Sequence, residues 1–232
     1  MPVKQTLPID LYFWPTANGI KISIFLEEVG APYSLHFVNI SRGDQFDKEF
    51  LAVSPNNRIP AIVDPEGPGG KPISVFESGA ILLYLGRKYG LLYPKDERRR
   101  VAVEEWLIWQ VANVGPVLGN NNHFRTYAPE KVPYAISRFL NETYRLYRVL
   151  NERLQGRDFV ADEYSIADIA VFGWIRNWER RGIDIAEFPN VRRWVETIAA
   201  RPAVIRGLAH KAPVEVDVSK DKDAQKILFG QR

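Results

Sequence analysis

The sequence predicts a two-part protein, with an α/β half of about ninety residues followed by an all-helical half. Two observations support this prediction. Short apolar and aromatic runs bounded by turn residues alternate with helical patterns as far as the polar stretch at 94–97, and no convincing strand pattern follows that stretch. The predicted order of the first half is β-α-β-α-β-β-α, in which a βαβ unit with a right-handed crossover precedes a ββα unit.

The predicted elements of the first half are short. The segment Gly30-Ala31-Pro32 ends the first helix, and the Gly/Pro-rich segment PEGPGGKP joins the last two strands as a hairpin. In chain order the predicted elements are a strand at 9–13, a helix at 20–29, a strand at 34–40, a short helix at 46–52, strands at 61–63 and 73–75, and a helix at 78–89.

In the second half, apolar residues recur at helical spacing in four segments. The second segment begins near Pro133. Ser165-x-x-Asp168 opens the third as a capping box with Asp in place of Glu or Gln, a structural feature to which we assign no chemistry. The expected domains are 8–93 (α/β), 98–210 (all-helical) and 211–232 (a C-terminal extension). For the extension, a disordered tail and an arm packed across a dimer or over the site fit the sequence equally well.

Composition narrows the class of function. Lys plus Arg (31) exceeds Asp plus Glu (28) only slightly, and no basic cluster is interleaved with aromatic residues, so nucleic acid is not an expected partner. No window approaches the roughly 18 apolar residues of a membrane span, so a membrane partner is not expected. The expected location is the cytoplasm. The absence of cysteine excludes thiolate catalysis by the protein and cysteine metal sites, and the three scattered histidines predict no metal site.

Two short segments have chemistry suited to a small peptide ligand. A cis bond at Ile59-Pro60 would cost only about 0.5–1 kcal/mol and would turn the N–H and C=O of Ile59 toward an extended peptide, although a trans proline that starts a strand is the simpler local expectation. Ser78 suits the N-cap of a helix whose free N–H groups attract a carboxylate, and Glu77 suits the neighbouring ammonium. An ordinary N-cap beside an exposed acid is the alternative.

A third segment, Thr16-Ala17-Asn18, lies where the first predicted strand meets the first predicted helix. A hydroxyl and an amide at a helix start can hydrogen-bond a ligand thiolate, and such surroundings lower the pKa of a thiol. A turn and N-cap, with Gly19 supplying flexibility, explains the same residues without any ligand.

The ordered set of these segments resembles the glutathione S-transferase superfamily over about residues 8 to 212. The resemblance includes the I-P-A-I-V-D turn, the F-E-S-G-A-I-L-L-Y-L segment, the polar linker and the S-I-A-D-I-A capping box. The segments D-L-Y-F-x-P-T-x-N-G-x-K-I, S-P-N-N-R-I-P-A-I-V-D and N-N-N-H-F…P-Y-A-I-x-R narrow it to the bacterial Nu class of disulfide-bond reductases.

This resemblance implies a thioredoxin-like N-terminal domain (βαβ-ββα), a C-terminal helical bundle, a homodimer, and glutathione as co-substrate. It also implies that each site binds two glutathione thiols, or one glutathione disulfide, and reduces small-molecule disulfides without a protein cysteine. Many members of the superfamily place Tyr, Ser or Cys beside the thiol, whereas this loop offers Thr16. Conventional conjugation of glutathione to electrophiles and non-catalytic glutathione binding are the alternative functions.

The roles of single residues also come from the resemblance. Thr16 and Asn18 are expected to orient and stabilise the glutathione sulfur. The backbone of Ile59, with Pro60 cis, is expected to pair with the cysteinyl part. The other expected glutathione contacts are Glu77 and Ser78 at the γ-glutamyl end, Arg58 at the glycyl carboxylate, Asn57 and Gln45 nearby, and Arg138 reaching across from the partner subunit.

Overall fold

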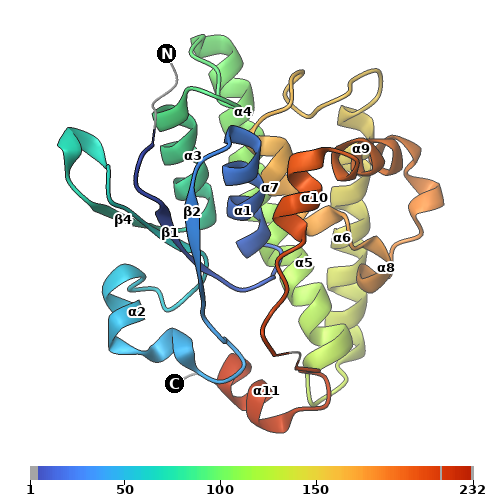
Figure 1. The fold of residues 1–232 in the computed structure, drawn as a ribbon. Coiled ribbons are helices and arrows are strands. Elements are labelled where there is room, and N and C mark those ends of the chain that lie inside the picture. Colours follow the sequence, from blue (N-terminus) through green and yellow to red (C-terminus); the bar gives the residue numbers. More distant parts are fainter. Residues whose placement is uncertain (1–4, 215, 231–232) are drawn as a thin grey trace. The chain divides into compact units, whose positions relative to one another are not determined.

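The computed structural model describes residues 5–214 and 216–230 (Figure 1). Residues 215 and 231–232 of the expected extension, like residues 1–4, lie outside this range. The strands are β1 (Ile9–Phe13), β2 (Tyr33–Phe37), β3 (Ala61–Asp64) and β4 (Ile73–Phe76). The helices are α1 (Gly19–Val29), α2 (Lys48–Val53), α3 (Ser78–Tyr89), α4 (Glu97–Trp109), α5 (Gly115–Asn122), α6 (Pro133–Arg153), α7 (Ile166–Ile175), α8 (Trp178–Arg181), α9 (Pro189–Ala199), α10 (Pro202–Leu208) and α11 (Lys222–Phe229).

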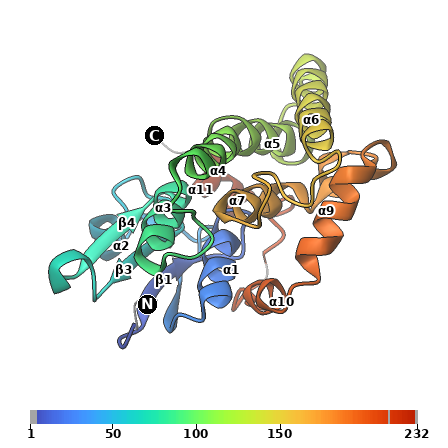
Figure 2. The same cartoon turned by 90° about the horizontal axis from the view of Figure 1, so that it is seen from above.

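The four strands form one mixed sheet in the order β2-β1-β3-β4. β1 is parallel to β2 and antiparallel to β3, and β3 is antiparallel to β4. Leu11 and Phe13 are fully buried, whereas Tyr12 points to the other face and packs on Phe50 of α2. α1 and α3 lie side by side in both views (Figures 1 and 2). The predicted α/β half, with its βαβ and ββα units, is therefore confirmed, as is the all-helical half that follows.

The structure adds short turns that the apolar pattern does not predict. One π-helical segment, Gln110–Val114, lies between α4 and α5, and a second, His123–Tyr127, follows α5. Helices α8, α10 and α11 are also unpredicted, because four to eight residues are too few for a helical period to stand out. α11 gives the described part of the extension a helix, with Asp221 accepting a hydrogen bond from the Ala224 N–H at 2.9 Å.

Contacts divide the chain into two compact units, Met1–Leu91 with Pro202–Arg232, and Leu92–Arg201. The first unit includes α10 because α10 packs on α1. A Cβ atom on Gly207 would lie 2.8 Å from the Cα of Ile24, and the Ser23 hydroxyl donates to the Gly207 carbonyl at 2.8 Å. This close approach admits only glycine. The expected helical domain, 98–210, includes α10, whereas the compact units assign α10 to the first unit. The units are defined by contacts, and the expected boundaries at 8–93, 98–210 and 211–232 are defined by changes in sequence composition and pattern. Those boundaries stay a prediction.

In the second unit, α7 is buried along nearly its whole length and is held by a capping box. The Ser165 hydroxyl accepts a hydrogen bond from the Ala167 N–H at 3.3 Å, and the Asp168 carboxylate accepts one from the Ser165 N–H at 3.1 Å. The structural role predicted for this segment is confirmed.

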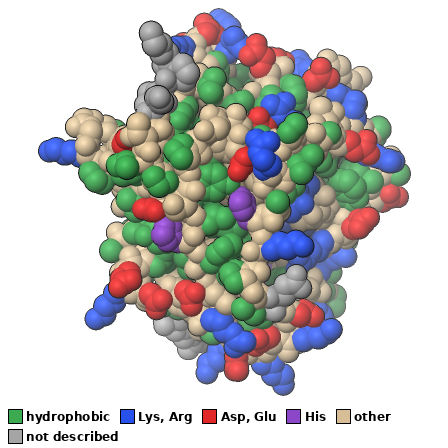
Figure 3. Space-filling view, viewed as in Figure 1, with side chains coloured by type: hydrophobic (Ala, Val, Ile, Leu, Met, Phe, Trp, Pro, Cys, Tyr) green, Lys and Arg blue, Asp and Glu red, His purple; other side chains and the backbone are tan. Residues whose placement is uncertain are grey.

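Within the described residues, no helix combines the length and apolar character needed to cross a membrane, and no group of three or more His, Asp or Glu side chains is placed to hold a metal ion. Acidic and basic side chains are interspersed on the face seen in Figure 3.

Candidate functional site

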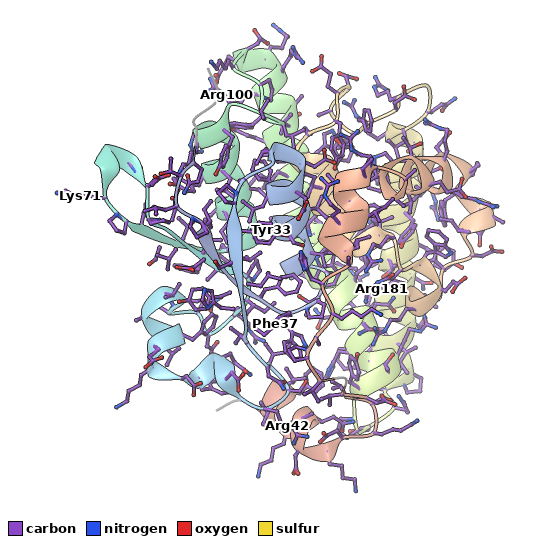
Figure 4. All side chains as sticks on the ribbon, viewed as in Figure 1. Tyr33, Phe37, Arg42, Lys71, Arg100 and Arg181 are labelled. Atoms are coloured by element: carbon purple, nitrogen blue, oxygen red, sulfur yellow. The ribbon has the colours of Figure 1, made fainter. Side chains whose placement is uncertain are left out.

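The strand register gathers the predicted site segments of the first unit at one end of the sheet. Tyr12 lies opposite Ala61, and Ala61 lies opposite Phe76, so the end of β1, the start of β3 and the end of β4 coincide. Phe13 pairs with Phe37 in the parallel ladder, which brings the end of β2 to the same place (Figure 4). The predicted site residues lie in the segments that leave or enter the strands at this end. They are Thr16 and Asn18 after β1, Gln45 after β2, Ile59 and Pro60 before β3, and Glu77 and Ser78 after β4.

Thr16 shapes the start of α1. Its hydroxyl oxygen accepts a hydrogen bond from the Gly19 N–H at 3.2 Å, and its carbonyl accepts one from the Ile20 N–H at 3.1 Å. A Cβ atom on Gly19 would lie 2.1 Å from the Trp14 carbonyl oxygen, so this position requires glycine for close approach. No described residue accepts the Thr16 hydroxyl hydrogen. Asn18 is half-buried at the N-cap position of α1 and makes no side-chain cap hydrogen bond.

The bond between Ile59 and Pro60 is cis. The trans form favoured by local sequence alone is therefore wrong, and the cis form implied by the resemblance is confirmed. The turn is tied down by Ser54, a fully buried residue whose hydroxyl donates to the Arg58 carbonyl at 2.8 Å. Neither the N–H nor the C=O of Ile59 has a hydrogen-bond partner among the described residues, so this backbone edge is open to an extended ligand.

Glu77 joins β4 to α3 in a rare backbone conformation, with φ 68° and ψ 116°. Such a conformation costs of order 1–3 kcal/mol for a residue other than glycine and is found mostly at functional sites. Its carbonyl accepts the first helical hydrogen bond, from the Ile81 N–H at 2.9 Å. Its exposed carboxylate accepts a hydrogen bond from the Asn56 side chain at 3.1 Å. Asn56 was not among the predicted site residues, although it stands in the S-P-N-N-R-I-P segment.

Ser78 is the first residue of α3, and the N-cap position belongs to Glu77. The predicted N-cap role of Ser78 is therefore wrong by one residue. The Ser78 hydroxyl is instead turned toward α1, where its oxygen accepts a hydrogen bond from the Lys21 ammonium at 3.1 Å. The N–H groups of the first turn of α3, from residues 78 to 80, have no acceptor in the described part of the chain, which leaves donors for an anion.

Lys21 is a residue of this region to which sequence reasoning gave no role. It lies in the first turn of α1 with only 1% of its surface exposed. Burial lowers the pKa of its ammonium group to about 7, and the Glu77 carboxylate acts in the opposite direction. The sequence carries two signals for it: a lysine inside the apolar run I-K-I-S-I-F-L, where a cation is unexpected on a buried helix, and its place as the lysine of the N-G-x-K-I stretch.

The remaining predicted contacts differ in their surroundings. Gln45 is buried, and its amide donates to the Ile40 carbonyl at 3.1 Å, while its side-chain oxygen has no partner among the described residues. Asn57 has a positive φ of 48°, and Arg58 is exposed. Arg138 is on α6 in the second compact unit, where it forms an ion pair with Glu142 at 3.6 Å, and so the first unit does not contain it.

Comparison with known proteins matches both halves of the chain. Residues 7–87 match the glutathione S-transferase N-terminal domain, and residues 130–202 match the glutathione S-transferase C-terminal domain. A disulfide-bond oxidoreductase of Escherichia coli (strain K12), YfcG, is 52% identical over 202 residues, which cover 86% of this chain and 94% of that protein.

Two solved structures have the same fold. A glutathione transferase from Burkholderia graminis, with two glutathione molecules bound per subunit, has a TM-score of 0.83 and 44% identity, covering 87% of each chain. A glutathione transferase from Pseudomonas putida, with one glutathione disulfide bound per subunit, has a TM-score of 0.85 and 43% identity, covering 90% of this chain and 94% of that one.

Proposed function

Because this chain belongs to the glutathione S-transferase family, we propose that it is a glutathione-dependent disulfide-bond reductase of the Nu class. It binds two glutathione thiols, or one glutathione disulfide, in each site. The observation that carries the proposal is the set of open hydrogen-bonding groups at one end of the sheet: the Thr16 hydroxyl hydrogen, the Ile59 backbone and the first turn of α3. The 52% identity to a disulfide-bond oxidoreductase supports the same class of reaction.

The γ-glutamyl end of glutathione carries a carboxylate and an ammonium on one carbon. The free N–H groups of α3 and the Ser78 hydroxyl suit the carboxylate, and Glu77 suits the ammonium. The strained backbone of Glu77 lets its own side-chain carboxylate and the N-terminus of α3 face the same ligand, the first for the ammonium and the second for the carboxylate. The Asn56 amide, which bonds the Glu77 carboxylate, restrains that side chain.

The rest of glutathione extends from this anchor. The cysteinyl part pairs with the open backbone of Ile59, as a strand pairs with a sheet edge. Arg58, exposed beside it, meets the glycyl carboxylate, and Asn57 supplies a further amide. Gln45 has a buried side-chain oxygen that no described residue bonds, and a ligand N–H satisfies it.

The chemistry resides in the bound thiols, since the sequence contains no cysteine. Thr16 donates its hydroxyl hydrogen to the first glutathione sulfur, and together with Asn18 it favours the thiolate. This thiolate attacks one sulfur of the substrate disulfide, forms a mixed disulfide and releases the other sulfur as a thiolate, which takes up a proton. The second glutathione thiolate attacks the glutathione sulfur of the mixed disulfide, which yields glutathione disulfide and a second substrate thiol.

The proposal includes a cytoplasmic homodimer, because the reaction uses reduced glutathione and because Arg138 is proposed to reach the glutathione of the partner subunit. Arg138 is more than half exposed, and among the described residues its ion-pair partner is Glu142, so it has freedom to meet a ligand carboxylate across a subunit boundary.

Turnover of hydroxyethyl disulfide with glutathione tests the proposal. We expect robust disulfide turnover, feeble conjugation of an aryl halide, and two bound thiols per site by calorimetry. Conjugation faster than disulfide turnover, with one bound thiol, would support a conventional transferase instead. Glutathione binding without either reaction would point to a binding protein.

A further inference from the structure

Lys21 places a positive charge at a buried position on α1. Its side chain is almost completely buried, and its ammonium lies 3.1 Å from the Ser78 hydroxyl oxygen. Transferring an ammonium from water to the protein interior is costly, so a buried lysine is uncommon unless its charge has a partner or a role. Here the charge lies between α1, which carries Lys21, and the first turn of α3, which carries Ser78.

The hydrogen bond from Lys21 determines how the Ser78 hydroxyl is used. A hydroxyl group has one hydrogen to donate and two lone pairs to accept with. Because the ammonium already donates to the oxygen, the Ser78 hydrogen points elsewhere, and no described residue accepts it. The hydroxyl is therefore oriented as a donor at the start of α3, beside N–H groups that are also without acceptors.

Resting on the proposed glutathione site, we propose that Lys21 is a positioning residue for the α-carboxylate of the γ-glutamyl end. It orients the Ser78 hydroxyl toward that carboxylate and adds positive charge behind the N-terminus of α3. Lys21 itself does not touch the sulfur chemistry.

Electrostatics supports this arrangement. Burial lowers the pKa of Lys21, and the carboxylate of Glu77, at the start of α3, acts the other way by favouring the ammonium form. A bound α-carboxylate adds a second negative charge on the same side. Glutathione binding and the charge of Lys21 therefore stabilise each other.

The test compares two ligands that differ only in the α-carboxylate. One is glutathione, and the other is γ-aminobutyryl-cysteinyl-glycine, which retains the amino group and the thiol. Dissociation constants are measured by calorimetry on the full chain, wild type and Lys21→Met. We expect Lys21→Met to weaken glutathione binding by about ten- to hundredfold, as for loss of a charge-assisted hydrogen bond, and to change binding of the analogue by less than about threefold.

Kinetics provide a second readout. Lys21→Met should raise KM for glutathione and leave kcat at saturating glutathione within about twofold, because uniform loss of ground-state binding does not alter the chemical step. Lys71→Met is the matched control, because Lys71 is exposed on the β3–β4 hairpin and points outward in Figure 4, so its loss removes one positive charge without removing a contact to Ser78. It should change neither constant.

Equal loss of binding for both ligands, or no loss for either, would overturn the role of Lys21. If Lys21→Met does not fold, Lys21→Leu carries the same comparison, because it also removes both the donor and the charge. Failure of the wild type to bind glutathione would instead contradict the proposed function. If the wild type binds glutathione but Lys21→Met weakens the binding of both ligands equally, only the role of Lys21 is contradicted.

Discussion

The hydroxyl oxygen of Thr16 accepts the Gly19 N–H at 3.2 Å, which leaves the hydroxyl with one hydrogen and no described acceptor for it. The same side chain therefore holds the start of α1 and offers a donor to a ligand. Both tasks depend on the same hydroxyl, one through its oxygen and the other through its hydrogen.

Thr16→Ala should lower kcat/KM for disulfide reduction by about ten- to hundredfold, since one hydrogen bond to a thiolate is lost. Loss of the hydrogen bond from the Gly19 N–H should lower the free energy of unfolding by about 1 kcal/mol. Thr16→Ser retains the hydroxyl and should stay within a few-fold of wild type. The pKa of bound glutathione, followed by thiolate absorbance, should rise in the alanine variant only. An unchanged pKa would exclude Thr16 as the sulfur donor.

Arg138→Ala should raise KM for glutathione by about tenfold if this arginine reaches the ligand of a partner subunit. Stability should change by less than about 0.5 kcal/mol, because its ion pair with Glu142 is exposed. Arg145→Ala is the control, since Arg145 bonds the same Glu142 at 2.7 Å and is similarly exposed. Similar kinetics for the two variants would argue against a role for Arg138 at the site.

Asp168→Asn should destabilise the protein by about 3 kcal/mol in urea unfolding. The Asp168 carboxylate accepts from the Val160 N–H at 3.0 Å, the Trp194 indole at 2.9 Å and the Ser165 N–H at 3.1 Å. An asparagine NH2 group would face one of these donors and leave it unsatisfied. Asp158→Asn makes the same chemical change at a surface ion pair with Arg193 and should cost less than about 0.5 kcal/mol. Equal effects would show that the buried carboxylate is not the anchor of α7.

The stability contribution of Lys21 should depend on pH. Burial lowers its pKa in the folded protein to about 7, against the effect of Glu77, whereas the unfolded chain has the ordinary value of about 10.4. Between these values the unfolded chain binds more protons, so the free energy of unfolding contributed by Lys21 rises as pH increases from about 7 to about 10. The difference in unfolding free energy between wild type and Lys21→Met should rise over this window. The Lys71→Met difference should stay flat, and a flat Lys21 difference would show that its pKa is not lowered.

Much of the fold follows from local pattern. Turn residues such as Gly30 mark the ends of the short elements, and the spacing of apolar residues distinguishes strands from helices. Ser165 and Asp168 form the capping box that begins α7. Element ends were displaced by a few residues, as at β2, which ends at Phe37 and not at residue 40. The docking of α10 on α1 is not predicted, because it depends on the close approach of Gly207 to Ile24, which are far apart in the chain.

The candidate site likewise contains residues that local sequence segments predict and residues whose role depends on long-range contacts. Thr16, Ile59 and Glu77 came from segments whose order resembles a known family, and the register of the sheet brings their segments to one end. Asn56 and Lys21 had no assigned role, because their partners, Glu77 and Ser78, are 21 and 57 residues away in the chain. Local sequence cannot specify a hydrogen bond of that range.

The sequence by itself determined the order of the elements, the absence of cysteine and the requirement that any reactive thiol come from a ligand. Only the tertiary structure decided that Glu77, not Ser78, stands at the N-cap position of α3, and that the Ser78 hydroxyl turns toward a buried lysine. The physical reason is that a side chain's hydrogen-bond role depends on which group packs against it. The packing of α1 on α3 brings the Lys21 ammonium to Ser78, and that proximity is a property of the folded chain.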